Sequence, residues 1–218
     1  MKTEGTLRMH LKDTIFFYTR NDYLIVNNLL CGDMERLWEM AGVVNGDSKA
    51  MLKEHADGLI KLDKKSVARY QGRIYETLDD RAKANILVTA REDIANILGA
   101  MKPTKKRMLL YRTVFLVDDP LRPYTLPSYN IDDIAEFQTI TSTSLAPYRE
   151  DAGFAFLRYE ITVPKGGRIL ELDRFSRVIR NEDGEVLLPP MQCRVTNIRG
   201  SENEHCKGII ALEYLEQL

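Results

Sequence analysis

The sequence has few cysteines and no excess of charge. Its three cysteines, Cys31, Cys193 and Cys206, form no Cys-x-x-Cys pair and no Cys/His cluster with zinc-ligand spacing. A disulfide framework and a metal site are therefore not expected, and reduced thiols suggest the cytoplasm. Lys and Arg number 31 against 32 Asp and Glu, a net charge of −1 over 218 residues. This balance indicates neither a specific nucleic-acid partner nor an acidic membrane surface.

Several familiar sequence signals are also missing. The opening residues, MKTEGTLRMHLKD, contain no apolar run like that of a signal peptide, and no later run approaches membrane-spanning length. We therefore expect no cleavable leader and no membrane partner. The motifs GxGxxG, GxxxxGK[ST], HExxH and GxSxG do not occur, which argues against a Rossmann site, a P-loop, a zinc protease and a hydrolase elbow.

The first half of the chain has the apolar spacing of helices. We expect helical segments after the turn-like Arg20-Asn21-Asp22, with Gly32 and Gly42 ending the first two and Asp47 or Ser48 capping the third. A break is expected near 78–80, and Gly99 with Pro103 should end the helical half. The expected helices cover residues 23–30, 34–41, 50–62, 66–78 and 82–98.

After Pro103 the pattern changes to short apolar or alternating runs of strand length. These runs cover residues 108–116, 137–144, 154–163, 168–172, 185–188, 193–198 and 207–215. Helices followed by strands predict an α+β fold, with helices packed on a largely antiparallel sheet or sandwich. We expect one domain over 1–218, mainly helical over 1–103 and mainly strands over 104–218.

Three polar features lie in the strand half. They are Arg112 within Leu-Leu-Tyr-Arg-Thr-Val, the run Thr141-Ser-Thr-Ser-Leu145, and Glu185 within Asp-Gly-Glu-Val-Leu-Leu. Each has a structural explanation by itself: an arginine stem can lie along a strand, small hydroxylated residues are common on exposed strand faces, and a glutamate often opens a strand. Their combination and order are more specific.

In that order, the three blocks resemble the Arg-Ser-Glu class of mono-ADP-ribosyltransferases, which includes the botulinum Rho-modifying exoenzyme, the actin-modifying binary toxins and related phage enzymes. Tyr111-Arg112 resembles the family's aromatic-Arg strand, Ser142-Thr143-Ser144 its Ser-Thr-Ser motif, and 185–189 the strand with its catalytic glutamate. Residues 23–30 and 163–166 are weaker similarities. The resemblance implies a helical layer on a two-sheet antiparallel β-sandwich, with NAD as substrate and no metal.

The resemblance also implies roles for individual residues. Arg112 would hold the NAD phosphate or the adjacent ribose, for which a planar guanidinium is suited. Ser142 would orient Glu185, and Glu185 would stabilise the positive charge that develops on the ribose as nicotinamide leaves. Further cofactor-binding candidates are Tyr111, Thr143, Ser144, Tyr148 and Arg149.

Acceptor recognition is expected just before Glu185. Many arginine-modifying members have Glu two residues before the catalytic glutamate and asparagine-modifying members have Gln, whereas this sequence has Asp183. Asp183 or the neighbouring Glu182 could polarise a guanidinium, so arginine is slightly favoured as acceptor, and Phe175 begins a loop that contacts the target in relatives. The implied partner is a host or target-cell protein modified by a monomer, which acts in the cytoplasm or after delivery into another cell. Alternatives are an NAD glycohydrolase, an RNA-modifying enzyme, or a non-catalytic binding module on the same fold.

Overall fold

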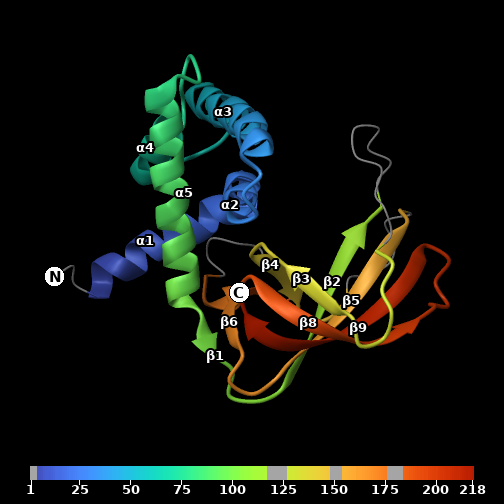
Figure 1. Cartoon of the computed structure of the whole chain (residues 1–218). Coiled ribbons are helices and arrows are strands. Elements are labelled where there is room, and N and C mark those ends of the chain that lie inside the picture. The colour runs from blue at the N-terminus through green and yellow to red at the C-terminus, as the bar shows by residue number, and fades with distance from the viewer. Residues whose placement is uncertain (1–3, 117–126, 148–153, 176–183) are drawn as a thin grey trace. The chain divides into compact units, whose positions relative to one another are not determined.

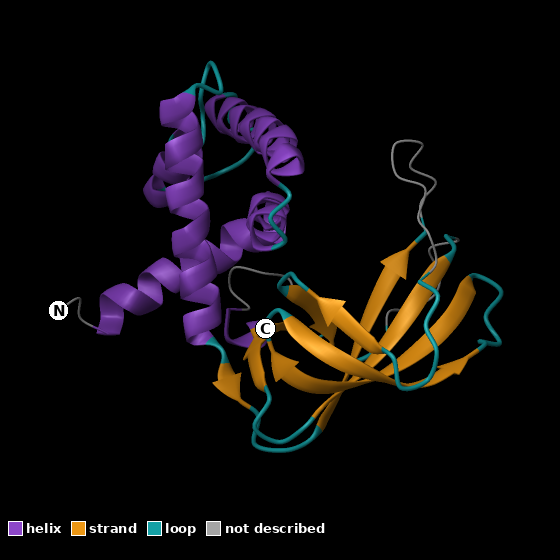
Figure 2. Ribbon diagram, in the orientation of Figure 1, coloured by secondary structure: helices purple, strands orange, loops and turns teal. Residues whose placement is uncertain are grey.

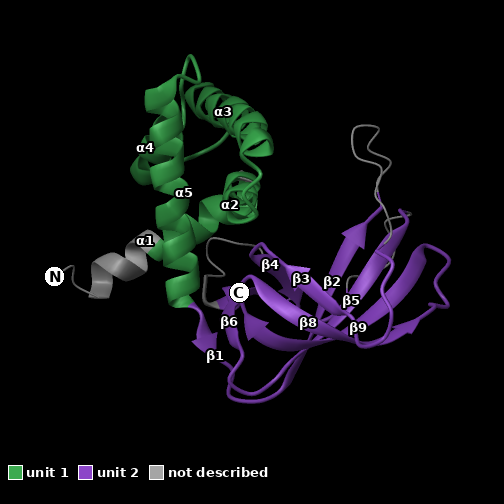
Figure 3. Cartoon of the chain, in the orientation of Figure 1, with its two compact units in different colours: residues 1–100 green, residues 101–218 purple. Residues whose placement is uncertain are grey.

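The computed structural model describes residues 4–116, 127–147, 154–175 and 184–218. The chain forms two compact units, residues 1–100 and 101–218 (Figure 3). The first unit is helical and the second consists mainly of strands (Figure 2), so the structure combines helices and sheet as expected. The change from helix to strand falls close to the expected residue 103. That both units form one catalytic domain remains a prediction.

The helical unit is built around a small apolar core. Its elements are α1 (Glu4–Phe17), the π-helical turn η1 (Tyr18–Asp22), α2 (Tyr23–Leu30), α3 (Met34–Ala56), α4 (Lys64–Gln71) and α5 (Asp80–Ala100). Asp33 and Asp63 cap α3 and α4, because their carboxylates accept hydrogen bonds from the backbone amides of Arg36 and Ser66. One cluster of its buried residues consists of Ile25, Leu37, Ala41, Val44 and Ala90.

Several helix predictions were wrong, including the end of the expected helix 66–78, since α4 ends at Gln71. Helix α1 was not expected, since its sequence shows little apolar periodicity. Helix α3 continues through Gly42 and Gly46 instead of ending at Gly42, and Ser48 is buried inside it rather than capping a new helix. A glycine in a helix interior costs only about 1 kcal/mol relative to alanine. Burial of Leu37 and Val44 on one face of the helix outweighs that cost.

The second unit contains a nine-stranded sheet, and Figure 1 shows how its strands lie side by side. Its strands are β1 (Lys102–Pro103), β2 (Met108–Phe115), β3 (Ile134–Phe137), β4 (Thr141–Ser144), β5 (Phe156–Val163), β6 (Arg168–Glu171), β7 (Glu185–Leu188), β8 (Met191–Arg199) and β9 (Cys206–Gln217), with a 3-10 turn η2 at Leu172–Phe175. The strand order is β1-β6-β7-β4-β2-β5-β9-β8-β3. All pairs are antiparallel except β5 with β9, which are parallel. The expected strand over 137–144 is in fact two strands, β3 at the sheet edge and β4 inside the sheet.

The sheet has one narrow junction, between β2 and β4. Among the described residues, these strands share the single register pair Tyr111↔Ser144, whereas β2 pairs with β5 over eight residues and β4 with β7 over four. The junction joins a four-stranded part, β1-β6-β7-β4, to a five-stranded part, β2-β5-β9-β8-β3. The expected division into two antiparallel sheets is therefore not confirmed, because hydrogen bonds connect the two parts.

The three cysteines differ in their exposure. All three cysteines are free; Cys193 and Cys206 are buried, whereas Cys31 is exposed and does not pack in the interior. Burial raises the pKa of the Cys193 thiol from 9.0 to about 12. No helix within the described part of the chain is both long enough and apolar enough to cross a bilayer.

Candidate active site

Arg112, Ser142 and Glu185 meet at the junction between the two parts of the sheet. They lie on β2, β4 and β7, which are adjacent strands. The Ser142 hydroxyl donates a hydrogen bond to Oε1 of Glu185 at 2.6 Å. The Arg112 guanidinium donates through Nη1 to the backbone carbonyl of Ser142 at 3.1 Å. Residues that are 30 and 43 positions apart in the sequence are thus joined by two direct contacts.

The register of β4 with β7 explains the contact between Ser142 and Glu185. Ser144 lies opposite Glu185, and Ser142 lies opposite Leu187. Alternate residues of a strand share a face, so both serines lie on the face that carries Glu185. Ser142 is the diagonal neighbour of Glu185, within reach of a long carboxylate side chain.

Thr143 anchors β4 from the other face. Its side chain is buried, and its hydroxyl donates to the backbone carbonyl of Val186 at 2.7 Å. This bond crosses from β4 to β7 next to the pair that holds Glu185. Ser144 reaches the opposite neighbour, since its hydroxyl donates to the carbonyl of Tyr111 on β2 at 3.4 Å. The Ser-Thr-Ser run therefore ties β4 to both adjacent strands.

Arg112 lies where β2 and β4 stop pairing. It directly follows Tyr111, the last residue of β2 paired with β4. Its guanidinium donates to the Ser142 carbonyl in a part of β4 that, among the described residues, has no register pair with β2. The Arg112 side chain thus bridges the opening between the two parts of the sheet and brings a permanent positive charge close to Glu185.

The arrangement combines two chemical capacities. All three residues are half-buried, so their polar groups are held by the protein while remaining partly accessible. A carboxylate oriented by a hydroxyl can stabilise positive charge on a reacting group, and a guanidinium can bind phosphate. Within the described residues, no cluster of three or more His, Cys, Asp or Glu side chains is arranged to hold a metal ion.

Several candidates named from the sequence cannot be placed. Tyr148, Arg149, Glu182 and Asp183 lie outside the described residues. Phe175 is the last residue of η2. Their proposed contacts with NAD or with an acceptor remain predictions.

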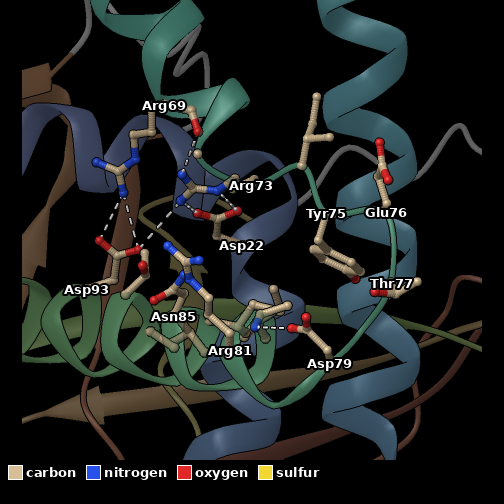
Figure 4. Close-up of a pocket in the computed structure, with 18 residues that line it drawn as sticks. Asp22, Arg69, Arg73, Tyr75, Glu76, Thr77, Asp79, Arg81, Asn85 and Asp93 are labelled. Atoms are coloured by element: carbon tan, nitrogen blue, oxygen red, sulfur yellow. Dashed lines mark hydrogen bonds and ion pairs between the residues drawn. The ribbon is translucent and has the colours of Figure 1, made fainter.

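A second group of polar residues, which the sequence did not suggest, lines a cavity in the helical unit (Figure 4). The cavity has a volume of about 570 Å³ and is lined by residues of η1, α2, α4, α5 and the α4–α5 connection. Arg69 donates to both oxygens of Asp93, at 3.0 and 3.2 Å, and Arg73 pairs with Asp22. The only sequence signal is the i, i+4 spacing of the two arginines; in the structure Arg69 lies on α4 and Arg73 in the turn that follows it.

The charged side chains beside this cavity form ion pairs with one another. Thr14 also donates to Asp93 at 2.9 Å, and Arg73 lies 3.8 Å from the same carboxylate. Burial raises the pKa of Asp93, and the charge of Arg69 opposes that rise. Two arginines and two aspartates that pair with each other join α4, α5 and η1, which is a structural role. The cavity is lined only by residues of the helical unit, so it contains none of Arg112, Ser142 and Glu185.

Comparison with known proteins gives a match in structure only. No protein-family model and no curated protein sequence matches the chain. Among solved structures, the Salmonella SpvB ATR domain matches with a TM-score of 0.55 and 16% identity, over 95% of this chain and 99% of that one. The catalytic domain of VahC from Aeromonas hydrophila matches with a TM-score of 0.54 and 14% identity, over 94% and 97%. The catalytic domain of VsdC from the same organism gives 0.52 and 13%, over 94% and 99%.

At these identities the likeness concerns the fold. The matches nevertheless extend over nearly the whole length of both chains, including the helical unit. Several of the structural neighbours are bacterial mono-ADP-ribosyltransferase toxins, the class that the three sequence blocks resemble. This chain has the ADP-ribosyltransferase fold.

Proposed function

We propose that this chain is a mono-ADP-ribosyltransferase that cleaves NAD and transfers ADP-ribose to a macromolecular acceptor, with protein arginine slightly favoured. The observation that carries the proposal is the 2.6 Å hydrogen bond from Ser142 to Glu185, beside Arg112 on an adjacent strand. The ADP-ribosyltransferase fold supports the same reaction class. Fold alone does not establish function, so the proposal depends on the three side chains.

The chemistry follows from the charges of the site. Breaking the glycosidic bond sends the bonding electrons to nicotinamide, which leaves as a neutral base, while positive charge develops on the ribose. Glu185 stabilises that charge and accepts a hydrogen bond from a ribose hydroxyl, and Ser142 keeps the carboxylate oriented. Arg112 binds the NAD phosphates and holds the reacting bond near Glu185. An acceptor nucleophile then bonds to the ribosyl carbon and loses a proton.

The acceptor decides between transfer and hydrolysis. A guanidinium of a target-cell protein would bind next to the acidic residues before Glu185, which include Asp183. Without an acceptor, water attacks the same carbon and NAD is hydrolysed slowly. The same site therefore supports both reactions, and the balance between them identifies the biological activity.

The test measures both fates of the substrate. Purified protein is incubated with NAD labelled in its adenylate part, with and without a cell lysate, and labelled macromolecules and free ADP-ribose are quantified. We expect label on protein, lost with Glu185→Gln and retained with Glu213→Gln, an exposed β9 glutamate that serves as control. Free ADP-ribose without labelled macromolecules would indicate an NAD glycohydrolase, and label on RNA would indicate an RNA-modifying enzyme. If no NAD is consumed, the protein is instead a non-catalytic binding module.

A further inference from the structure

The residue before Glu185 has a conformation that favours glycine. Gly184 has a φ of +66°, in the left-handed region that other residues rarely adopt. It immediately precedes β7, so its backbone determines how the chain enters the strand that carries Glu185. Its carbonyl accepts a hydrogen bond from the backbone amide of Leu145 at 3.1 Å. This bond extends the pairing of β4 with β7 by one residue beyond Ser144↔Glu185.

The side chain of Leu145 occupies the space beside Gly184. A Cβ atom at position 184 would lie 2.8 Å from Cδ1, 3.1 Å from Cγ and 3.3 Å from Cβ of Leu145. The leucine end can rotate, because the residue is 46% exposed. Its Cβ is fixed to the backbone of the strand end and has much less freedom. A side chain at position 184 would therefore push against the last hydrogen bond between β4 and β7.

We infer that Gly184 and Leu145 form a positioning pair that holds the Glu185 carboxylate against Ser142 during NAD cleavage. This inference rests on the proposed function. Glu185 is the first residue of β7, where a strand is least constrained by its neighbours. The Leu145–Gly184 hydrogen bond holds that end, and the absence of a Cβ at Gly184 lets Leu145 approach closely enough to make it. The 2.6 Å contact from Ser142 to Glu185 depends on this alignment.

The kinetic test compares glycine variants. We expect Gly184→Ala to lower kcat for nicotinamide release about tenfold, because a displaced catalytic group loses its alignment. The KM for NAD should stay the same, because Arg112 is not moved. Gly58→Ala is the matched control: Gly58 has a similar φ of +75°, a Cβ there meets nothing within 4 Å, and it lies in the helical unit.

A second substitution tests the contact itself. Adding Leu145→Ala to Gly184→Ala removes Cδ1 and Cγ, the two atoms nearest to the new Cβ, and leaves only the 3.3 Å contact with the Cβ of residue 145. We therefore expect the double variant to recover part of the lost kcat. A kcat for Gly184→Ala equal to that of the unmodified protein would overturn the inference. A double variant no faster than Gly184→Ala would overturn the role of Leu145.

A readout without NAD separates this inference from the proposed function. Amide hydrogen exchange at Leu145, measured by NMR, should become about tenfold faster in Gly184→Ala and stay unchanged in Gly58→Ala. Unchanged exchange at Leu145 would contradict the inference even in a protein that cleaves no NAD. If Glu185→Gln abolishes cleavage while Gly184→Ala leaves kcat unchanged, the function stands and only the positioning pair is wrong.

Discussion

The guanidinium of Arg112 combines a structural contact with a charge that suits the proposed substrate. It donates to the carbonyl of Ser142 at 3.1 Å from a half-buried position on β2. A lysine would retain the charge but would lose the planar set of donors that allows one side chain to contact the backbone and a phosphate together.

Arg112→Lys therefore tests the donor geometry at constant charge. We expect the KM for NAD to rise about tenfold or more, since a hydrogen bond to a charged group is worth about 1.5–3 kcal/mol. Initial-rate kinetics measure the change, with Arg107→Lys, an exposed residue just before β2, as the control. An unchanged KM in Arg112→Lys would show that the charge alone is sufficient.

At the scale of single elements, the sequence predicts strands better than helix ends. The strands at 108–116 and 185–188 are close to β2 and β7, because alternating apolar residues and turn signals mark them. The run at 137–144 predicts one strand, because nothing local shows that the chain leaves one part of the sheet between Phe137 and Thr141 and enters the other. Strand neighbours depend on long-range pairing, which local patterns do not encode.

The candidate site was predictable only in part for the same reason. The three blocks suggested Arg112, Ser142 and Glu185, and the structure brings these residues together. The importance of Gly184 could not be read from the sequence, because its φ and its contact with Leu145 follow from the pairing of β4 with β7. The network of Asp22, Arg69, Arg73 and Asp93 was missed because it joins three elements.

The continuity of α3 gives a prediction about stability. Gly42 is an exposed residue inside this helix, with open space where a Cβ would lie. Gly42→Ala should raise the free energy of unfolding by about 1 kcal/mol, the difference in helix propensity. Chemical denaturation of the variant and of the unmodified protein measures this difference in the free energy of unfolding. Gly58→Ala is the opposite case, because its positive φ predicts a loss of about 1–2 kcal/mol. Destabilisation by Gly42→Ala would mean that the helix breaks at Gly42.

At the scale of the whole molecule, the core of the sheet determines how stability responds to alkali. Cys193 is fully buried in the main apolar cluster, and burial raises the pKa of its thiol from 9.0 to about 12. The unfolded chain releases this proton at lower pH than the folded chain does. The stability linked to the thiol is therefore complete below pH 9 and falls as the pH rises toward 12.

Comparison with Cys193→Ala isolates this effect. Above pH 9, the free energy of unfolding of the unmodified protein should fall relative to the variant by about 1.4 kcal/mol per pH unit. Denaturant unfolding curves between pH 8 and 10.5 supply the values. Parallel pH profiles for the two proteins would contradict burial of the thiol in the folded state.

The whole-length match to structures that are 13–16% identical shows how little sequence the ADP-ribosyltransferase fold requires. The proposed function connects this fold to a reaction through the three side chains at the junction of β2, β4 and β7. The most direct measurement is nicotinamide release from NAD by the purified protein and by Glu185→Gln. We predict release by the unmodified protein and a loss of about 100-fold or more in the variant, as expected when the main electrostatic stabiliser is removed. Equal release by both proteins would contradict the assignment of Glu185 and the active site built around it.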